Sequence, residues 1–414
     1  DIMSHMPLTK DAYVAASDTY DYSHMYADAV RQLTGADYAV ANLETVLGGG
    51  PKYSGFPAFN SPDALAKGAK DAGFDLLSTA NNHCMDRGMD GIYRTLDVLD
   101  EYGLAHVGTY RSQAERDENH GIVVADVGGI SVAFLSYTYG LNGNRLPEDG
   151  KYAVNLFNLD YYTTLSDPDY ETLSADLAAA RALDADLIAV LIHWGVEYQN
   201  APNDYQESLA RYLVGQGADL VLGGHPHVLQ PYETVTAQGE DGQERTGFVC
   251  YSLGNFLSNQ QELETKTTAV LDLDYESGTL WAVGENQLSI VSDSDGSVQT
   301  YAFDRSYLKG CALGGDGFAL LLLGRYRAGS ASRALVIGGD GLELAELPLS
   351  SQVLDFDAAG SYCSLLTGSA LTIYTKDLAQ YAQLDSVQGA RTTALSADGS
   401  ALLADDQEVW LYIP

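Results

Sequence analysis

Four apolar runs without polar alternation recur along the first part of the chain, and each is opened by an Asp. Runs of this kind are typical of strands that are buried on both faces. Polar residues follow six to eight positions after each opening Asp, so they stand at the carboxyl ends of the predicted strands. The four segments are residues 35–44, 73–83, 184–193 and 217–227.

Helical patterns separate these strands. Ser61-Pro62-Asp63 predicts a helix start, because Ser61 can cap the first turn and Pro62 fits inside it. The helix is expected to end near Gly73. Further helices are predicted over residues 89–102, 171–182 and 204–215.

Residues 121–138 predict two strands that are joined at Gly128-Gly129 as a hairpin. The alternation of helices and strands predicts a layered α/β domain over residues 1–275. In open α/β sheets, ligands bind outside the carboxyl ends of the strands. Polar side chains from distant segments are therefore expected to meet in one cleft. These residues are Glu44, Asn82, His83, His193, His225 and His227.

Beyond about residue 275 the helical patterns give way to short apolar segments with turn signals between them. One series of turns, Asp316-Gly317, Ala359-Gly360 and Asp398-Gly399, recurs at intervals of 43 and 39 residues. A second series comprises Asp295-Gly296, Asp340-Gly341 and Lys376-Asp377. A period near 40 residues with short strands is typical of propeller blades. We expect an all-β domain over residues 276–414 with about three blades, and strands over residues 311–323 and 353–366.

Acidic residues dominate the charge, with 57 Asp and Glu against 22 Lys and Arg and a net charge of −35. Such a surface repels nucleic acid and anionic lipid headgroups, so a nucleic-acid partner is not expected. The four cysteines are scattered, without metal or redox spacing. The sequence opens at Asp1 without an initiator Met, and we expect the strand that leads into Asp1, and any membrane anchor, to lie upstream.

The residue types at the predicted strand ends are those that bind transition metals. His225 and His227 flank Pro226 after two glycines, a rigid arrangement that suits a divalent ion. Glu44 can bridge two cations, and the amide oxygen of Asn82 adds a ligand without adding charge. Mixed nitrogen and oxygen donors suit Zn, Mn or Fe rather than Ca. Two such ions clamp the oxygens of a phosphoryl displacement, and His83 could then act as general acid.

Four further residues have two interpretations each. Asp86 and Arg87 either orient the site or, for Asp86, cap a helix. Glu197 supports the site or contacts substrate, or else is a surface acid. Asn255, which follows a predicted strand over residues 248–253, is either a site contact or a turn residue.

Six motifs in order resemble the CapA-type bacterial capsule-synthesis proteins, which are linked to poly-gamma-glutamate production. They are Asp1-Ile2-Met3, Ala41-Asn42-Leu43-Glu44-Thr45, Asn81-Asn82-His83, His193-Trp194-Gly195-Val196-Glu197, Gly224-His225-Pro226-His227 and Ser252-Leu253-Gly254-Asn255-Phe256. That family resembles the calcineurin-like metallophosphoesterases. This chain departs from the wider superfamily at two positions. The superfamily has Asp-x-His at its first motif, whereas here His5 lies four residues after Asp1. The superfamily also has Asp at the position of Glu44.

The resemblance implies a ligand set for two divalent ions. Asp1 and His227 would bind the first ion and Glu44 would bridge both. Asn82, His193 and His225 would bind the second ion, with His83 catalytic. His5, Asp86, Arg87, Glu197 and Asn255 would then support the site or contact substrate.

Three functions remain open at the level of sequence. The first is a metal-dependent hydrolase of capsule, poly-gamma-glutamate or other envelope polymer metabolism, which acts on an anionic polymer or a phosphoester. The second is a non-catalytic accessory of polyglutamate synthesis, export or anchoring, and the third is an adhesive or scaffolding surface protein. The resemblance also implies an extracellular, membrane-anchored protein that works with membrane-bound capsule-synthesis machinery.

Overall fold

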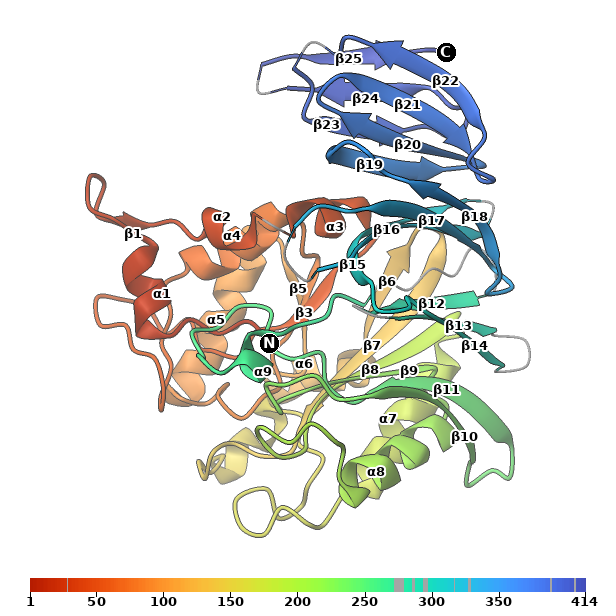
Figure 1. Cartoon of the computed structure of the whole chain (residues 1–414). Helices are drawn as coiled ribbons and strands as arrows, with labels where there is room; N and C mark the ends of the chain where they lie inside the picture. Colours follow the sequence, from red (N-terminus) through yellow and green to blue (C-terminus); the bar gives the residue numbers. More distant parts are fainter. Residues whose placement is uncertain are drawn as a thin grey trace. The chain divides into compact units, whose positions relative to one another are not determined.

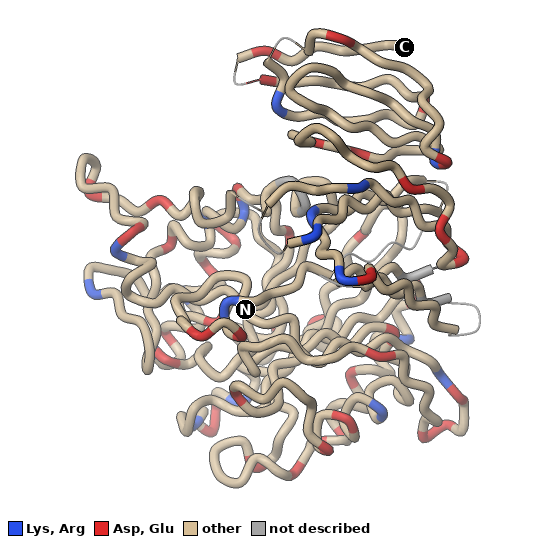
Figure 2. The backbone as a smooth tube through the Cα atoms, in the orientation of Figure 1, with Lys and Arg blue, Asp and Glu red and all other residues tan. Residues whose placement is uncertain are grey.

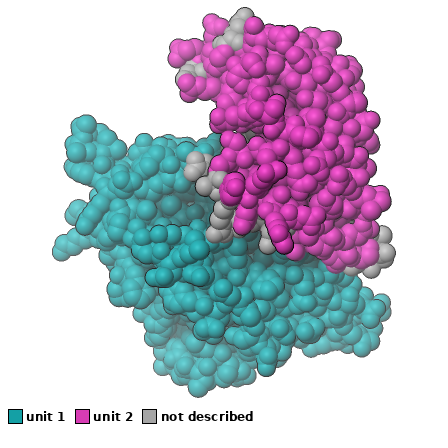
Figure 3. Space-filling model, viewed as in Figure 1, with its two compact units in different colours: residues 1–269 teal, residues 270–414 magenta. Residues whose placement is uncertain are grey.

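The chain forms two compact units, residues 1–269 and residues 270–414, in a computed structural model (Figures 1 and 3). The structure describes residues 1–27, 29–271, 279–284, 287–292, 297–315, 317–326, 329–387, 389–405 and 407–414. The domain boundary expected at residue 275 lies outside these described residues.

Two sheets form the centre of the first unit. The smaller one is parallel and contains β3 (Val40–Asn42), β4 (Leu76–Ser78) and β5 (Ala105–Val107). The larger one has the order β10-β11-β9-β8-β7-β6, in which the four central strands are parallel and both edge strands antiparallel. Its strands are β6 (Val123–Val127), β7 (Ile130–Thr138), β8 (Leu187–His193), β9 (Leu220–Gly224), β10 (Tyr232–Gln238) and β11 (Glu244–Cys250). The four predicted strands and the predicted hairpin are therefore confirmed, and the strands are divided between two sheets.

The start of the chain adds a short parallel segment to the smaller sheet. Ile2 forms parallel bridges with Leu43 on one side and Leu257 on the other. Its backbone nitrogen donates to Asn42 at 2.8 Å, and its carbonyl accepts from the nitrogen of Glu44 at 2.8 Å. This pairing places Asp1 beside the carboxyl end of β3. A short pair, β1 (Tyr13–Val14) and β2 (Thr19–Tyr20), follows.

The predicted helices are confirmed, with small shifts at their ends. They are α4 (Ala64–Ala72), α5 (Gly88–Tyr102), α7 (Tyr170–Ala182) and α8 (Asp204–Gly215). The shorter helices are α1 (Met6–Asp11), α2 (Ser23–Tyr26), α3 (Val30–Gly35), α6 (Gln113–Asp117), α9 (Leu263–Lys266) and the 3-10 turns η1 (Glu118–Gly121) and η2 (Glu148–Ala153). Within the described residues, no helix is long and apolar enough to cross a membrane.

The capping role predicted for Ser61 is wrong. Helix α4 follows Asp63, which forms no side-chain cap. The hydroxyl of Ser61 instead lies 2.7 Å from that of Thr45, and the carboxylate of Asp63 accepts from Arg94 at 2.7 Å. A buried polar network thus takes the hydroxyl that the sequence pattern assigned to the helix start.

Strand alternation sorts the side chains of the larger sheet into two faces. On β8, Ile188, Val190 and Ile192 belong to a core that α7 and α8 cover (Figure 1). His193 has the opposite parity, so it faces the smaller sheet. The two sheets meet there, because the hydroxyls of Ser78 on β4 and Ser136 on β7 lie 2.7 Å apart. Helices α4 and α5 contribute to a second core with the smaller sheet, so the predicted layered α/β fold is confirmed.

The second unit consists of antiparallel sheets. Among the described residues these are β12-β13-β14, β15-β16-β17-β18, β19-β20-β21-β22 and β23-β24-β25. Their strands are β12 (Thr279–Val283), β13 (Gln287–Ser292), β14 (Val298–Ala302), β15 (Tyr307–Gly314), β16 (Phe318–Gly324), β17 (Arg333–Gly338), β18 (Glu343–Pro348), β19 (Val353–Ala359), β20 (Tyr362–Thr367), β21 (Ala370–Thr375), β22 (Gln380–Asp385), β23 (Thr392–Leu395), β24 (Ala401–Ala404) and β25 (Val409–Tyr412). The strands expected over residues 311–323 and 353–366 are confirmed, but the expected count of about three blades falls short by one sheet.

Consecutive sheets of this unit share their cores. On β16, Ala319, Leu321 and Leu323 pack with Trp281 of the first sheet. The alternate residues Phe318, Leu320 and Leu322 pack with the third sheet. A further core joins the third sheet to the fourth. This stacking is blade-like, whereas a closed propeller is not shown by the described sheets.

The periodic turn signals correspond to equivalent turns of successive sheets. Gly317, Gly360 and Gly399 connect the first and second strands of the second, third and fourth sheets, and all three have positive φ. Asp340-Gly341 and Lys376-Asp377 connect third and fourth strands. Asp316 and the turn Asp295-Gly296 lie outside the described residues.

Substitution of Gly223 by Ala is expected to destabilise the first unit. A Cβ on this β9 residue would lie 2.1 Å from the carbonyl oxygen of Tyr251 and 2.4 Å from Nε1 of Trp194. Overpacking of this kind costs about 1–3 kcal/mol or more, and thermal unfolding should show a lower midpoint. Gly35→Ala is the control, because a Cβ there meets nothing within 4 Å. Equal midpoints for the two variants would contradict the tight packing around β9.

Candidate metal centre

The carboxyl ends of the four predicted strands converge on one buried site. Glu44 follows β3, Asn82 follows β4, His193 ends β8, and His225 and His227 follow β9. All five side chains are buried, and so is Asp1 beside β3. Side chains from distant segments therefore meet at one site, as expected, and they come from both sheets.

Glu44 lies at the centre of this cluster. Its side chain is completely buried, and neither carboxylate oxygen has a hydrogen-bond partner among the described residues. Nε2 of His193 lies 3.5 Å from Oε1, and Nε2 of His227 lies 3.8 Å from the same atom. Burial raises the pKa of this carboxyl group. A buried carboxylate without partners is costly, and a cation between it and the imidazoles removes that cost.

Two groups of potential metal ligands share Glu44. One contains Glu44, His193 and His225, and the other contains Asp1, Glu44 and His227. Within each group the ligand atoms lie within 4.8 Å of one another. Nδ1 of His225 is also buried without a partner. Burial lowers the pKa values of His193 and His225, which favours the neutral imidazole that a metal ion requires. These nitrogen and oxygen donors fit two transition-metal ions.

Backbone and amide groups hold Asp1 and His227 in place. The carboxylate of Asp1 accepts from Nδ2 of Asn42 at 2.8 Å and from the backbone nitrogen of His225 at 3.1 Å. Nδ1 of His227 lies 3.0 Å from Oδ1 of Asn255, and its Nε2 faces Glu44. Asn255 therefore contacts the site, which resolves its two interpretations in favour of a site contact.

The backbone of the histidine loop is strained. His225 and His227 adopt positive φ values of 97° and 59°, which are uncommon for residues other than glycine. Such strain concentrates at functional sites, where the surrounding structure maintains it. The ring of Tyr139 supports the loop, because its centroid lies 4.7 Å from that of His225 and its plane is nearly parallel to that of His193.

Asn82 lies between the two sheets. Its Oδ1 is 3.0 Å from Nε2 of His193, and its Nδ2 donates to Asn142 at 3.1 Å. The amide oxygen therefore points toward the group of Glu44, His193 and His225. This orientation agrees with the ligand role that the resemblance implies.

His83 is placed differently from the other histidines. Its Nδ1 lies 2.7 Å from Oδ2 of Asp86, and Asn142 approaches the ring at 3.3 Å. None of the three ligand groups found among the described residues includes His83. Asp86 also accepts from the backbone nitrogen of Phe59, whose ring packs edge-on against His83. Asp86 is therefore a partner of His83, and it does not cap α5, whose N-cap is Arg87.

The remaining predicted residues lie at the margin. Nε2 of His227 is 3.9 Å from the partly exposed carboxylate of Glu197, which forms a third ligand group with His225 and His227. His5 packs edge-on against Phe59, and its Nδ1 accepts from the backbone nitrogen of Asn259 at 3.4 Å.

Arg87 is directed to a neighbouring loop. It donates to the hydroxyl of Ser54 and, at 3.0 Å, to the carbonyl of Ala58. Within the described residues its hydrogen bonds go to Ser54, Ala58 and the carbonyl of Asp86, none of them a predicted ligand, so Arg87 supports the loop that carries Phe59.

Sequence reasoning missed Tyr139, Asn42 and Asn142 as residues of the site. Tyr139 directly follows β7, so the strand-end rule that identified the histidines applies to it as well. Asn42 stands in the Ala41–Thr45 motif, two positions before Glu44. Asn142 lies in an irregular loop with φ of 49°, and no local pattern marks it.

The chain matches the family described as "Bacterial capsule synthesis protein PGA_cap" over residues 1–260. It is 32% identical over 220 residues to the "Capsule biosynthesis protein CapA" of Bacillus anthracis, and this alignment covers 51% of this chain and 47% of that protein. It is 33% identical over 202 residues to the "PGA biosynthesis protein CapA" of Bacillus subtilis (strain 168), and this alignment covers 49% of this chain and 47% of that protein. The chain therefore spans about half the length of these curated relatives.

Solved structures resemble the chain only weakly. BamB from Moraxella catarrhalis has a TM-score of 0.24 and 15% identity, and the alignment covers 31% of this chain and 40% of that one. The Pan2 WD40 domain from Neurospora crassa has a TM-score of 0.23 and 14% identity, with coverage of 33% and 44%. Likenesses this weak carry no argument about the fold.

The resemblance to CapA-type proteins that the six motifs predict is thus confirmed. Because the matched region extends over more than half of the sequence, the chain belongs to the bacterial capsule synthesis protein PGA_cap family.

Proposed function

We propose that the first unit is a metal-dependent phosphoesterase of capsule or poly-gamma-glutamate polymer metabolism, which acts at the cell surface beside membrane-bound capsule-synthesis machinery. The observation that carries the proposal is the buried carboxylate of Glu44, which has no hydrogen-bond partner and belongs to two ligand groups. Family membership supports the biological setting.

The proposed ligand set follows the geometry. Asp1 and His227 would hold one divalent ion, His193, His225 and Asn82 would hold the other, and Glu44 would serve both. A pair of Zn, Mn or Fe ions would supply Lewis acidity toward a phosphoryl group and lower the pKa of water. Protonation of the leaving oxygen would then require a side chain of the protein.

His83 is positioned for that proton transfer. The carboxylate of Asp86 accepts from Nδ1 of the ring in this proposal. Nε2, which has Nδ2 of Asn142 at 3.4 Å, is then the atom that would serve a leaving alkoxide. Asp86 is itself almost completely buried, with 3% of its side chain exposed, which keeps the ring orientation constant. Tyr139 packs against His225, and Asn142 approaches the ring of His83.

The first prediction concerns metal content. The protein is expected to hold one or two transition-metal ions, and His225→Ala combined with His227→Ala should remove most of the metal, because each ligand group loses a donor. Elemental analysis of the purified protein measures this. The double variant His24→Ala and His120→Ala is the control, since both side chains are more than half exposed and lie outside the ligand groups. Equal metal in the two double variants would contradict the shared site.

The second prediction concerns catalysis. His83→Ala should retain the metal and lose about 10²–10⁴-fold in turnover of a generic phosphodiester, because general acid catalysis contributes that much. Glycerophosphocholine serves as the substrate, because its alkoxide leaving group needs a proton, and metal content is measured in the same samples. A metal-loaded protein without phosphoester turnover would refute the enzyme and favour a non-catalytic accessory of polymer synthesis or export.

A further inference from the structure

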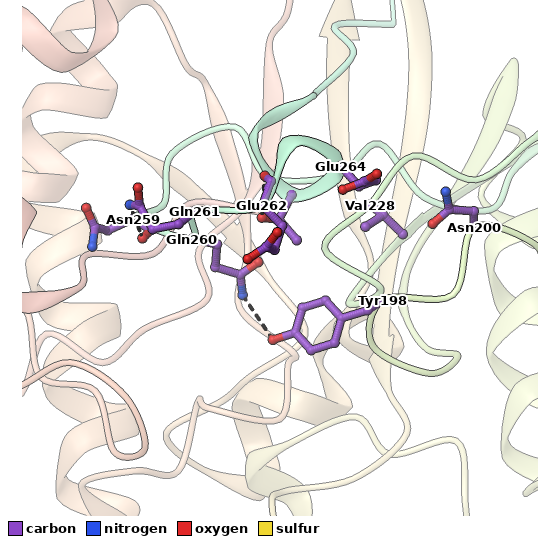
Figure 4. A pocket seen from close by; sticks show the side chains of 9 residues that line it. Tyr198, Asn200, Val228, Asn259, Gln260, Gln261, Glu262 and Glu264 are labelled. Atoms are coloured by element: carbon purple, nitrogen blue, oxygen red, sulfur yellow. Dashed lines mark hydrogen bonds between the residues drawn. The ribbon is translucent and has the colours of Figure 1, made fainter.

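A cavity of about 610 Å³ lies beside the loop that carries His227, and Figure 4 shows the side chains that line it. Val228, the next residue in the chain, lines it, and so does Tyr198, whose ring centroid is 6.0 Å from that of His227. Gln260, also in the lining, accepts from the Asn255 amide that holds His227. A molecule in this cavity would therefore lie beside the proposed phosphoryl site.

Six of the nine described residues that line the cavity carry neutral hydrogen-bonding side chains. Four carboxamides face it, from Asn200, Asn259, Gln260 and Gln261. Each carboxamide both donates and accepts hydrogen bonds. A sugar hydroxyl does the same, so the lining is complementary to a ligand that carries many hydroxyls. None of the described lining residues is Lys or Arg.

Tyr198 offers a fixed aromatic face. Its side chain is 53% exposed, and its hydroxyl accepts from Nε2 of Gln260 at 3.3 Å, the bond drawn in Figure 4. Its backbone has a positive φ of 65°, and its nitrogen donates to the carbonyl of Pro226 at 2.8 Å. The backbone strain and the two hydrogen bonds fix the position of an exposed ring, which suits the ring to ligand contact. The apolar C–H face of a sugar ring can pack against it, while the hydroxyls reach the carboxamides.

The electrostatics of the cavity disfavour an anionic chain. Glu262 and Glu264 both line it, and the carboxylate of Glu197 lies 3.9 Å from Nε2 of His227. In Figure 2, red acidic positions are spread along the tube of both units, in keeping with the net charge of −35. Carboxylates accept hydrogen bonds from sugar hydroxyls but repel the free carboxylates of a glutamate polymer.

We propose that this cavity binds neutral sugar residues, and that the group attached to the scissile phosphate is a glycan and not polyglutamate. The proposal rests on the proposed phosphoesterase and names the substrate class of the same site. The cavity is within the size range of small-ligand sites. In this proposal the phosphate would be bound by the metal ions, and the sugar by the cavity.

Calorimetric titration of the metal-loaded full chain tests the proposal. The probes are tetra-N-acetylchitotetraose, maltotetraose and an octamer of γ-linked glutamate. At least one neutral tetrasaccharide should bind more tightly than the glutamate octamer. Tighter binding of the octamer, or binding of neither sugar, would overturn the proposal.

Variants locate the binding in the cavity. Tyr198→Ala should weaken binding of the neutral sugar about tenfold, because the aromatic face is lost, and Tyr198→Phe should retain most of it. Tyr13→Ala is the control, an exposed tyrosine that bonds Asp18 outside the cavity. Equal losses in Tyr198→Ala and Tyr13→Ala would refute the assignment.

The two proposals fail separately. Sugar binding without phosphodiester turnover would refute the enzyme and keep the glycan site. Turnover of glycerophosphocholine without sugar binding would refute the glycan site and keep the enzyme.

Discussion

The geometry of the first unit depends on one buried carboxylate. Glu44 is fully enclosed, yet its oxygens lack hydrogen-bond partners among the described residues, a condition that proteins rarely leave uncompensated. Around it the chain gathers imidazoles and a second carboxylate from strands that are distant in sequence. The strain at His225 and His227, the amide contacts of Asn42 and Asn255, and the ring of Tyr139 all serve to aim ligand atoms at this point.

Much of this arrangement is predictable from sequence, because buried parallel strands leave a clear record. Uninterrupted apolar runs identify β8 and β9, and the rule that ligands gather at the carboxyl ends of strands identifies His193, His225 and Glu44. Residues placed by irregular backbone escape this logic. Asn142 contacts His83 from a loop. Ser61 contacts the hydroxyl of Thr45 and does not cap a helix. Neither contact has a local sequence signal.

The second unit shows a related limit. The spacing of turns identifies repeated antiparallel sheets, since Gly317, Gly360 and Gly399 occupy equivalent turns with positive φ. The number of sheets is harder to obtain, because the sheet of β12, β13 and β14 lacks a turn in the first series. Its presence is revealed by packing, through Trp281 against the alternate residues of β16. Periodicity records the turns, whereas the stacking of the sheets depends on side chains far apart in the chain.

The division of the ligands between two sheets has a mechanical consequence. His193, His225 and His227 belong to the larger sheet, whereas Glu44 and Asn82 extend from the smaller one. The ions proposed for this site would act as cross-links across the layer interface, so their binding free energy would also oppose separation of the sheets. Metal affinity and the rigidity of the two packed sheets would thereby be coupled.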